Sequence, residues 1–213
     1  MFLVKSPFTF THTAPTAESG KQPAIFLLHG MGSNEEDLPQ LVQDFKDSHH
    51  IFSLRGPIEF DPGYAFFTIE EAGKPIRIVF DEVLTYIQSF IHEAIAEFGL
   101  DEERVYVLGF SQGAVLAQSL ALTMGSVIRG VVALSGYVPD FVKMDYAKQP
   151  VAHLNAFISH GEYDYIIPPH WGRESKEYFE LLGANVTFKS YNDGHGVTPE
   201  NHHDLVAFLR QFE

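Results

Sequence analysis

Gly109-Phe110-Ser111-Gln112-Gly113 is the stretch of sequence that decides the fold of this chain. The stretch has the pattern G-x-S-x-G, and it joins the apolar run 105–108 to the helix-like run 114–120. Between a strand and a helix, this pattern predicts a sharp turn that projects the serine oxygen above the sheet. Glycines suit both flanking positions because the strand and the helix crowd each other there. A turn that merely contains a serine has the same pattern, so other segments must decide.

Two later segments supply partners for Ser111. A short apolar run at 155–159 is soon followed by Asp164, and His195 lies between two glycines after the run 186–190. Serine, aspartate, histidine is the chain order of α/β-hydrolases. A serine hydroxyl is a poor nucleophile unless an imidazole takes its proton, and a carboxylate orients that imidazole. The sequence therefore predicts a catalytic triad of Ser111, Asp164 and His195.

Two other acidic residues compete with Asp164 for the third position. Asp140 follows the strand-like run 131–134, where a hydrolase can also carry its acid, so it stays as the alternative. Asp193 is too close to His195 in sequence to be a comfortable partner, and a role in a turn fits it better. We prefer Asp164 because an acid soon after a strand and a glycine is the tighter pattern.

The segment His29-Gly30-Met31-Gly32-Ser33 follows a buried-strand pattern at 24–28. It matches the H-G type of loop that provides one N–H of an oxyanion hole, the other coming from the residue after the nucleophile. We therefore expect the backbones of Met31 and Gln112 to be the two donors. The residues from Ser33 to Glu36 also have the pattern of a capping box, which predicts a helix that begins at Ser33 and ends near Phe45.

These motifs together resemble the phospholipase/carboxylesterase family of small α/β-hydrolases. The resemblance runs from about Ile25 to the C-terminus, and its motifs are L-L-H-G-M-G-S, R-G-P-I, G-Y-A-F-F, G-F-S-Q-G, H-G-E-Y-D-Y-I-I-P and G-H-G. It implies the same triad and hydrolysis of esters or thioesters without a cofactor. A homodimer is compatible with it. The chain departs from the family at Phe67, where many members carry Trp, and in the stretch from Thr68 to Ile78, whose length can differ.

Three aromatic residues in G-Y-A-F-F, namely Tyr64, Phe66 and Phe67, are the predicted substrate-binding residues. They lie in a stretch, 55–77, whose prolines and glycines predict a long irregular loop. Aromatic side chains in a loop are expected to cover apolar surface. They can line an acyl pocket beside Ser111, as the resemblance suggests, or form a small core cluster under the loop.

Composition narrows the class of protein further. A chain of 213 residues that is 45% hydrophobic suits a single domain, 1–213, and the absence of cysteine excludes disulfides and thiolate chemistry. The formal charge of −14 argues against binding to nucleic acid or to anionic membranes. Paired histidines at 49–50 and 202–203 point in diverging directions on either a strand or a helix, so we expect no metal site. The residues 1–4 are too short an apolar stretch for an export signal, which makes a cytoplasmic location the expectation.

Strand-like and helix-like runs alternate along the chain, which predicts an α/β fold with a mostly parallel central sheet and helices on both faces. Helices are expected over 83–98, 171–182 and 198–212, and residues 8–11 are expected to form an edge strand.

The predicted function is that of a serine hydrolase, which cleaves carboxylic esters of short to medium acyl chains through an acyl-enzyme. Thioesters remain an open alternative as substrates. The other candidates are a lysophospholipase that acts at lipid surfaces and a non-catalytic ligand receptor on a hydrolase scaffold.

Overall fold

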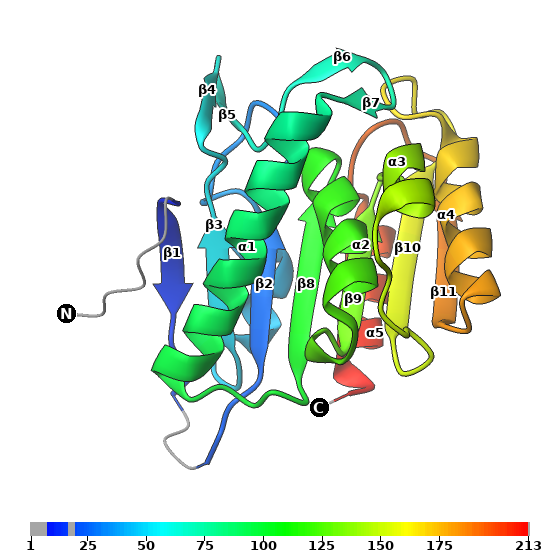
Figure 1. Ribbon diagram of the computed structural model, residues 1–213. Coiled ribbons are helices and arrows are strands. Elements are labelled where there is room, and N and C mark those ends of the chain that lie inside the picture. The colour runs from blue at the N-terminus through cyan, green and yellow to red at the C-terminus, as the bar shows by residue number, and fades with distance from the viewer. Residues whose placement is uncertain (1–7, 17–19, 213) are drawn as a thin grey trace.

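A seven-stranded sheet forms the centre of the molecule (Figure 1). The computed structural model describes residues 8–16 and 20–212, so the segment 1–4 considered for export lies outside the described residues. The strands run in the order β1-β3-β2-β8-β9-β10-β11, and β1 alone is antiparallel to its neighbour. They are β1 (Phe10–Thr13), β2 (Ala24–Leu28), β3 (His50–Leu54), β8 (Val105–Phe110), β9 (Gly130–Leu134), β10 (Asn155–Gly161) and β11 (Asn185–Tyr191). The predicted mostly parallel sheet is confirmed.

Helices cover both faces of this sheet, as the alternating pattern predicts (Figure 1). One face carries α1 (Arg77–Phe98), α2 (Gln112–Met124), α3 (Asp140–Asp145) and α4 (Pro169–Leu181). The other face carries the 3-10 helix η1 (Leu38–Phe45) and α5 (Pro199–Arg210). A short 3-10 turn, η2 (Gly125–Val127), follows α2.

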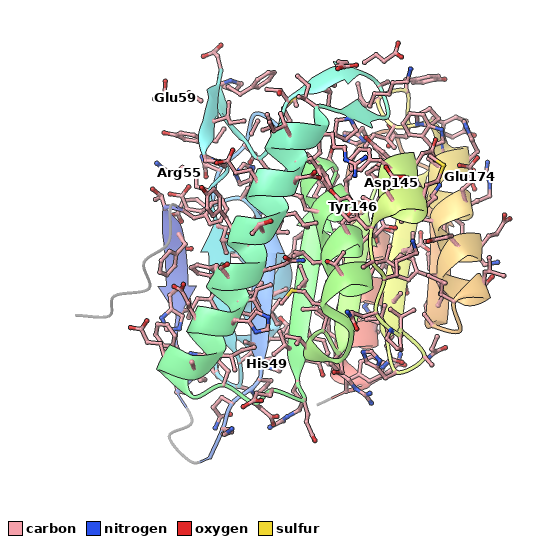
Figure 2. All side chains as sticks on the ribbon, viewed as in Figure 1. His49, Arg55, Glu59, Asp145, Tyr146 and Glu174 are labelled. Carbon is pink, nitrogen blue, oxygen red and sulfur yellow. The ribbon has the colours of Figure 1, made fainter. Side chains whose placement is uncertain are left out.

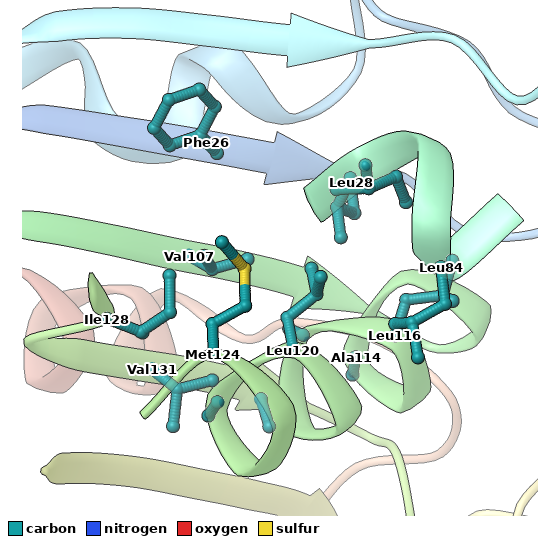
Figure 3. Packing of buried hydrophobic residues seen from close by; sticks show 14 of the residues in the cluster. Phe26, Leu28, Leu84, Val107, Ala114, Leu116, Leu120, Met124, Ile128 and Val131 are labelled. Carbon is teal, nitrogen blue, oxygen red and sulfur yellow. The ribbon is translucent and has the colours of Figure 1, made fainter. Parts of the chain in front are cut away.

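The hydrophobic core has two parts because the central strands are buried on both faces. Phe26 and Leu28 of β2 point to the α1 and α2 side, where Leu116 and Leu120 belong to the same cluster (Figure 3). Ile25 and Leu27 of the same strand belong to the cluster under η1 and α5. Alternation along a strand with apolar residues on both sides explains why the strands appear in the sequence as unbroken apolar runs.

The helix boundaries follow the local signals in the sequence. Gly99 ends α1 with a left-handed backbone, φ 62°, a conformation that glycine adopts without a steric penalty. Thr198 caps α5: its side-chain oxygen accepts a hydrogen bond of 3.1 Å from the Asn201 N–H. The three predicted helices are confirmed, and the predicted edge strand is β1, shifted by two residues.

Two local predictions are wrong. A helix does not begin at Ser33, because the carbonyl of Ser33 accepts a hydrogen bond of 2.8 Å from the Tyr64 N–H and its hydroxyl donates to Asp37 Oδ2 at 2.7 Å. Helical structure starts only at Leu38 and is a 3-10 helix. The stretch 55–77 is not an irregular loop, since it forms two small hairpins, β4 (Ile58–Phe60) with β5 (Gly63–Ala65) and β6 (Ile69–Glu71) with β7 (Lys74–Pro75).

Both hairpins lie at the carboxyl ends of the parallel strands (Figure 1). This is the end at which an open α/β sheet forms its ligand crevice. Among the described residues, no helix is long and apolar enough to cross a membrane.

Candidate active site

Ser111 lies in the turn between β8 and α2 with an unusual backbone conformation, φ 54° and ψ −116°. A side chain other than glycine is strained at such a positive φ. The neighbouring glycines explain how the turn fits. A methyl group on Gly113 would collide with the carbonyl of Leu28, and one on Gly109 would collide with the backbone of Gly113. The turn is therefore held by close backbone packing, as the G-x-S-x-G pattern predicts.

Ser111, His195 and Asp164 form one hydrogen-bonded chain. The Ser111 hydroxyl donates to His195 Nε2 at 2.8 Å, and His195 Nδ1–H donates to Asp164 Oδ2 at 2.7 Å. The two contacts together assign the proton of the neutral imidazole to Nδ1. The Asp164 side chain is fully buried, whereas that of His195 is 17% exposed. The three residues come from the ends of three different strands, which only the folded sheet brings together.

The Asp164 carboxylate is fixed from both sides. Its Oδ1 accepts hydrogen bonds of 2.9 Å from the N–H groups of Ile166 and Ile167, which leaves Oδ2 for His195. His160, at the end of β10, donates from Nε2 to the Ile167 carbonyl at 2.8 Å and also lies 3.3 Å from Asp164 Oδ2. Burial lowers the pKa of His160, so this imidazole stays neutral. It therefore holds the loop that carries Asp164.

The loop after β2 approaches the serine turn closely. His29 holds this loop, because its Nδ1–H donates to the Gly30 carbonyl at 2.6 Å and its Nε2 accepts from the Gly56 N–H at 2.9 Å. Burial lowers the pKa of His29 and so favours this neutral form. Within residues 8–16 and 20–212, no hydrogen bond occupies the backbone N–H of Met31 or of Gln112. Both residues line the same cavity as Ser111.

An apolar cavity of about 130 Å³ opens beside Ser111. Its walls come from the serine turn, the loop after β2, the β6–β7 hairpin and the segments around β10 and α4. The lining residues are Met31, Phe67, Ile69, Ala72, Gly73, Ser111, Gln112, Val115, Tyr137, Ile166, Ile167 and Trp171. An apolar recess next to a nucleophile suits a hydrocarbon group attached to the reacting carbon.

Comparison with known proteins agrees with this geometry. A sequence profile described as phospholipase/carboxylesterase matches residues 14–213. The chain belongs to the phospholipase/carboxylesterase family. It is 28% identical over 218 residues to acyl-protein thioesterase 1 of Candida albicans, with 92% of this chain and 94% of that protein covered. It is 30% identical over 225 residues to acyl-protein thioesterase 1 of Mycosarcoma maydis, with 91% and 93% covered.

Solved structures show the same relationship. The carboxylesterase of Bacillus cereus superposes with a TM-score of 0.84 at 25% identity, covering 96% of this chain and 94% of that one. The predicted α/β-hydrolase fold, the family and the class of enzyme, an ester or thioester hydrolase, are therefore confirmed.

The three aromatic residues that were predicted to bind substrate, Tyr64, Phe66 and Phe67, lie in different surroundings. Phe67 lines the cavity. Phe66 does not, because it is completely buried in the main core cluster and packs against the His29 ring with centroids 4.8 Å apart. Tyr64 lies under the Arg55 guanidinium, which sits 4.5 Å from the centre of its ring. Of the three, Phe67 lines the cavity, whereas the rings of Phe66 and Tyr64 pack against other side chains, so Phe67 is the candidate that the geometry favours.

Gln112 has a second contact that the sequence did not reveal. Its buried side-chain amide accepts a hydrogen bond from the Phe66 N–H and donates one to the Phe67 carbonyl, each at 2.6 Å. The residue after the serine thus joins the serine turn to the segment that carries Phe67. The G-x-S-x-G pattern could have drawn attention to an amide at this position, but its partners are 45 and 46 residues away.

A buried ion pair holds the β4–β5 hairpin close to the loop after β2. Arg55 donates to both carboxylate oxygens of Glu35, one of them at 2.6 Å, and Glu35 is 5% exposed. The Gly32 N–H donates to the Tyr64 carbonyl at 2.8 Å. Pairing with Arg55 lowers the pKa of Glu35, which keeps the carboxylate charged. Arg55 lies in the R-G-P-I motif, but no pattern in the sequence indicates that Glu35 is its partner.

Asp140, the alternative acid, makes no hydrogen bond or ion pair with His195 among the described residues. It begins α3 with its side chain 84% exposed and lies 3.5 Å from Lys143. Asp193 lies in the turn before His195, and its carbonyl accepts a hydrogen bond of 2.9 Å from the Tyr163 N–H. The structure brings Asp164 alone of these three acids to His195.

A larger depression, of about 580 Å³, lies at the opposite ends of the strands, and Arg104, Arg129 and Phe212 are among its lining residues. It is open and polar and lies far from the serine turn in the fold, so size alone does not mark the site of chemistry. Among the described residues, no group of three or more His, Asp or Glu side chains is arranged to hold a metal ion.

Proposed function

We propose that this protein hydrolyses carboxylic esters and thioesters of short to medium acyl chains through an acyl-enzyme on Ser111. The observation that carries the proposal is the chain of hydrogen bonds from Asp164 through His195 to Ser111, 2.7 and 2.8 Å long, beside an apolar cavity. Family membership supports the class of reaction. One relative is named an acyl-protein thioesterase and another a carboxylesterase. The two names refer to hydrolysis of thioesters and of oxygen esters, respectively.

The first half of the reaction acylates the serine. His195 Nε2 takes the hydroxyl proton while Ser111 Oγ forms a bond to the carbonyl carbon, whose π electrons move to its oxygen. The imidazolium is stabilised by the Asp164 carboxylate, which keeps its negative charge. Collapse of the tetrahedral intermediate breaks the bond to the leaving oxygen or sulfur, which receives the proton from His195. The products are the acyl-serine and an alcohol or thiol.

The backbone N–H groups of Met31 and Gln112 are proposed as the oxyanion hole. Both are without a hydrogen-bond acceptor in the part of the chain that the structure describes, and both belong to residues that line the cavity of Ser111. Donors fixed at the position of the developing charge are commonly worth about 3–4 kcal/mol each in transition-state stabilisation.

The second half of the reaction releases the acid. Water loses a proton to His195 Nε2 and attacks the acyl carbon, which forms a second oxyanion in the same hole. The proton then passes to Ser111 Oγ as its bond to the acyl carbon breaks. No cofactor is needed, because each proton that His195 takes is returned within the cycle.

A panel of p-nitrophenyl esters from acetate to palmitate, together with one acyl thioester, tests the proposal. We expect hydrolysis, a burst of p-nitrophenol, and an acyl adduct on Ser111 by mass spectrometry. A fluorophosphonate probe should label Ser111, and Ser111→Ala should prevent labelling. A folded protein that neither reacts with the probe nor turns over any ester would instead favour the non-catalytic receptor.

Lipid surfaces are a second candidate setting for the same chemistry. Ile69 and Ile166 line the cavity, yet they are 44% and 65% exposed, so apolar side chains surround its mouth. Such a rim favours contact with lipid, whereas the net charge of −14 opposes anionic membranes. Flotation with neutral and with anionic phospholipid vesicles distinguishes an enzyme that acts at lipid surfaces from one that acts on small esters. Binding to neutral vesicles alone would support a lysophospholipase, and no binding would support an enzyme of small esters in the cytoplasm.

A further inference from the structure

The cavity beside Ser111 has a neighbour on the other side of one wall. A second cavity of about 180 Å³ shares four lining residues with the first, namely Ala72, Gly73, Tyr137 and Trp171. The first cavity contains the serine and the proposed oxyanion donors, whereas the second contains neither. The shared residues therefore form the end of the first cavity that lies away from the reacting carbon.

The indole of Trp171 is held firmly in this wall. It packs edge to face on Tyr137, with ring centroids 4.9 Å apart, and belongs to the first turn of α4. Gly73, in the turn of the β6–β7 hairpin, lies next to the six-membered ring of the same indole. A methyl group on Gly73 would come within 2.6 Å of the indole, and its φ of 79° is also a conformation that favours glycine. A side chain at position 73 would therefore require the indole to move.

The two cavities differ in polarity. The first is lined mainly by apolar side chains such as Val115 and Ile167. The second has charged residues in its lining, namely Lys74, Asp140, Lys143 and Glu174. Figure 2 shows Glu174 on α4, on the same side of the sheet as Asp145 and Tyr146. The hydrocarbon part of an acyl chain is therefore stabilised in the first cavity. Beyond the residues shared by the two cavities it would contact water and charged side chains.

We propose that Trp171, packed against Gly73, sets the acyl-chain limit of this enzyme by closing the apolar cavity of Ser111 on the side of the second, charged cavity. The inference rests on the proposed ester hydrolysis and makes it more specific. Within the first cavity each added methylene is expected to raise kcat/KM about fourfold, until the chain reaches the indole. Longer chains must leave part of their length in water or displace the ring.

The test compares kcat/KM for p-nitrophenyl esters of two to sixteen carbons between the native protein, Trp171→Phe and Trp171→Ala. Leu181→Ala is the matched control, because Leu181 lies on the same helix and is 81% exposed. We expect Trp171→Ala to move the optimum by at least two carbons, Trp171→Phe to move it less, and Leu181→Ala to leave it unchanged. The rate of fluorophosphonate labelling should stay within about threefold in all of them, since the triad is unaltered.

Trp171 also offers a direct readout of binding, because it is the single tryptophan of the chain. In the Ser111→Ala background, medium-chain esters should change its fluorescence, whereas acetate esters should not reach the ring. A chain-length profile that is the same in native protein and both Trp171 variants, with normal probe labelling, would overturn the role of Trp171 in chain length. The proposed ester hydrolysis would be unaffected by that result. If medium-chain esters change the fluorescence but the native protein hydrolyses no ester, the proposed function is overturned. Contact between the acyl chain and Trp171 would still be supported.

If Trp171→Ala does not fold, Trp171→Phe and the fluorescence titration still decide. An unchanged optimum in Trp171→Phe, together with no response of the indole to any ester, would overturn the proposal.

Discussion

The serine turn and the segment 56–76 face the same cavity, but they are held in place in different ways. The turn is fixed by backbone packing, since Gly109 and Gly113 leave no room for even a methyl group. The segment is held by backbone hydrogen bonds of Tyr64 with Gly32 and Ser33 and, in addition, by side-chain contacts with residues such as Gln112 and Trp171. A turn held by close backbone packing cannot shift by a small amount, whereas side-chain contacts can be removed one at a time by substitution. Changes in the turn should therefore abolish activity, and changes at the segment should adjust it.

The largest effect is expected at the nucleophile. Ser111→Ala should lower kcat by a factor on the order of 10⁴ to 10⁶, because members of a triad act as a unit. Circular dichroism and the melting temperature should show a native fold. Turnover near the native rate in a folded, homogeneous preparation would mean that another residue is the nucleophile.

The same position can show that the turn is strained. Ser111→Gly should be more stable than Ser111→Ala by about 1–2 kcal/mol, because glycine adopts a positive φ without the cost that a side chain carries. Denaturant unfolding of the two inactive variants measures the difference. Equal stabilities would show that the turn stores no strain.

The next largest effect is expected at Asp164, the acid of the triad. Asp164→Asn should lower kcat/KM by a factor of about 10² to 10⁴, because an amide at this site no longer fixes the tautomer that His195 needs. Asp140→Asn is the matched control, since that side chain is 84% exposed and lies beside Lys143. The opposite ranking of the two variants would make Asp140 the acid.

The serine turn was predictable from sequence because its determinants are local. The pattern of glycines around Ser111 and the apolar runs that flank it are contiguous, and the order of serine, acid and histidine follows from the fold that they specify. The stretch 55–77 was not predictable, since short hairpins leave no periodic pattern and their anchors are distant in sequence. The same limit applies to Phe66 and Phe67, because the sequence of a loop does not reveal whether an aromatic ring packs on the core or lines a cavity.

The side chain of Gln112 joins the two regions, so removing it tests the comparison directly. Gln112→Ala leaves the Phe66 N–H and the Phe67 carbonyl without partners, which should cost about 1–3 kcal/mol of stability. It should also raise KM more than it lowers kcat, because the backbone N–H remains in place while Phe67 shifts.

Gln118→Ala is the control for this variant. Gln118 is buried on the same helix, and its amide contacts only the Ala114 carbonyl, at 3.2 Å, among the hydrogen bonds within the described residues. This change should alter the melting temperature but not KM. If Gln112→Ala behaves in the same way, its side chain has only a structural role.

The smallest effect is expected from the Arg55–Glu35 pair, and it depends on pH. Pairing lowers the pKa of Glu35 from its ordinary value of 4.5. A lowered carboxylate pKa in the folded state contributes stability that is present above pH 4.5 and is lost as pH falls through the folded pKa. Glu35→Gln should therefore be less stable than the native protein at neutral pH, and the difference between the two melting temperatures should shrink below pH 4.5.

The difference between the two proteins is the informative measurement, because buried histidines also respond to acid. Burial lowers the pKa of His12 and of His49 to about 4, so the unfolded chain binds more protons than the folded one between about pH 6.5 and pH 4, and both proteins lose stability there. That loss is common to both and cancels in the comparison. A difference in melting temperature that stays constant down to pH 3 would show that the Glu35 carboxylate contributes nothing through its charge. The hairpin would then be held by the contact of Arg55 with Tyr64 and by backbone hydrogen bonds alone.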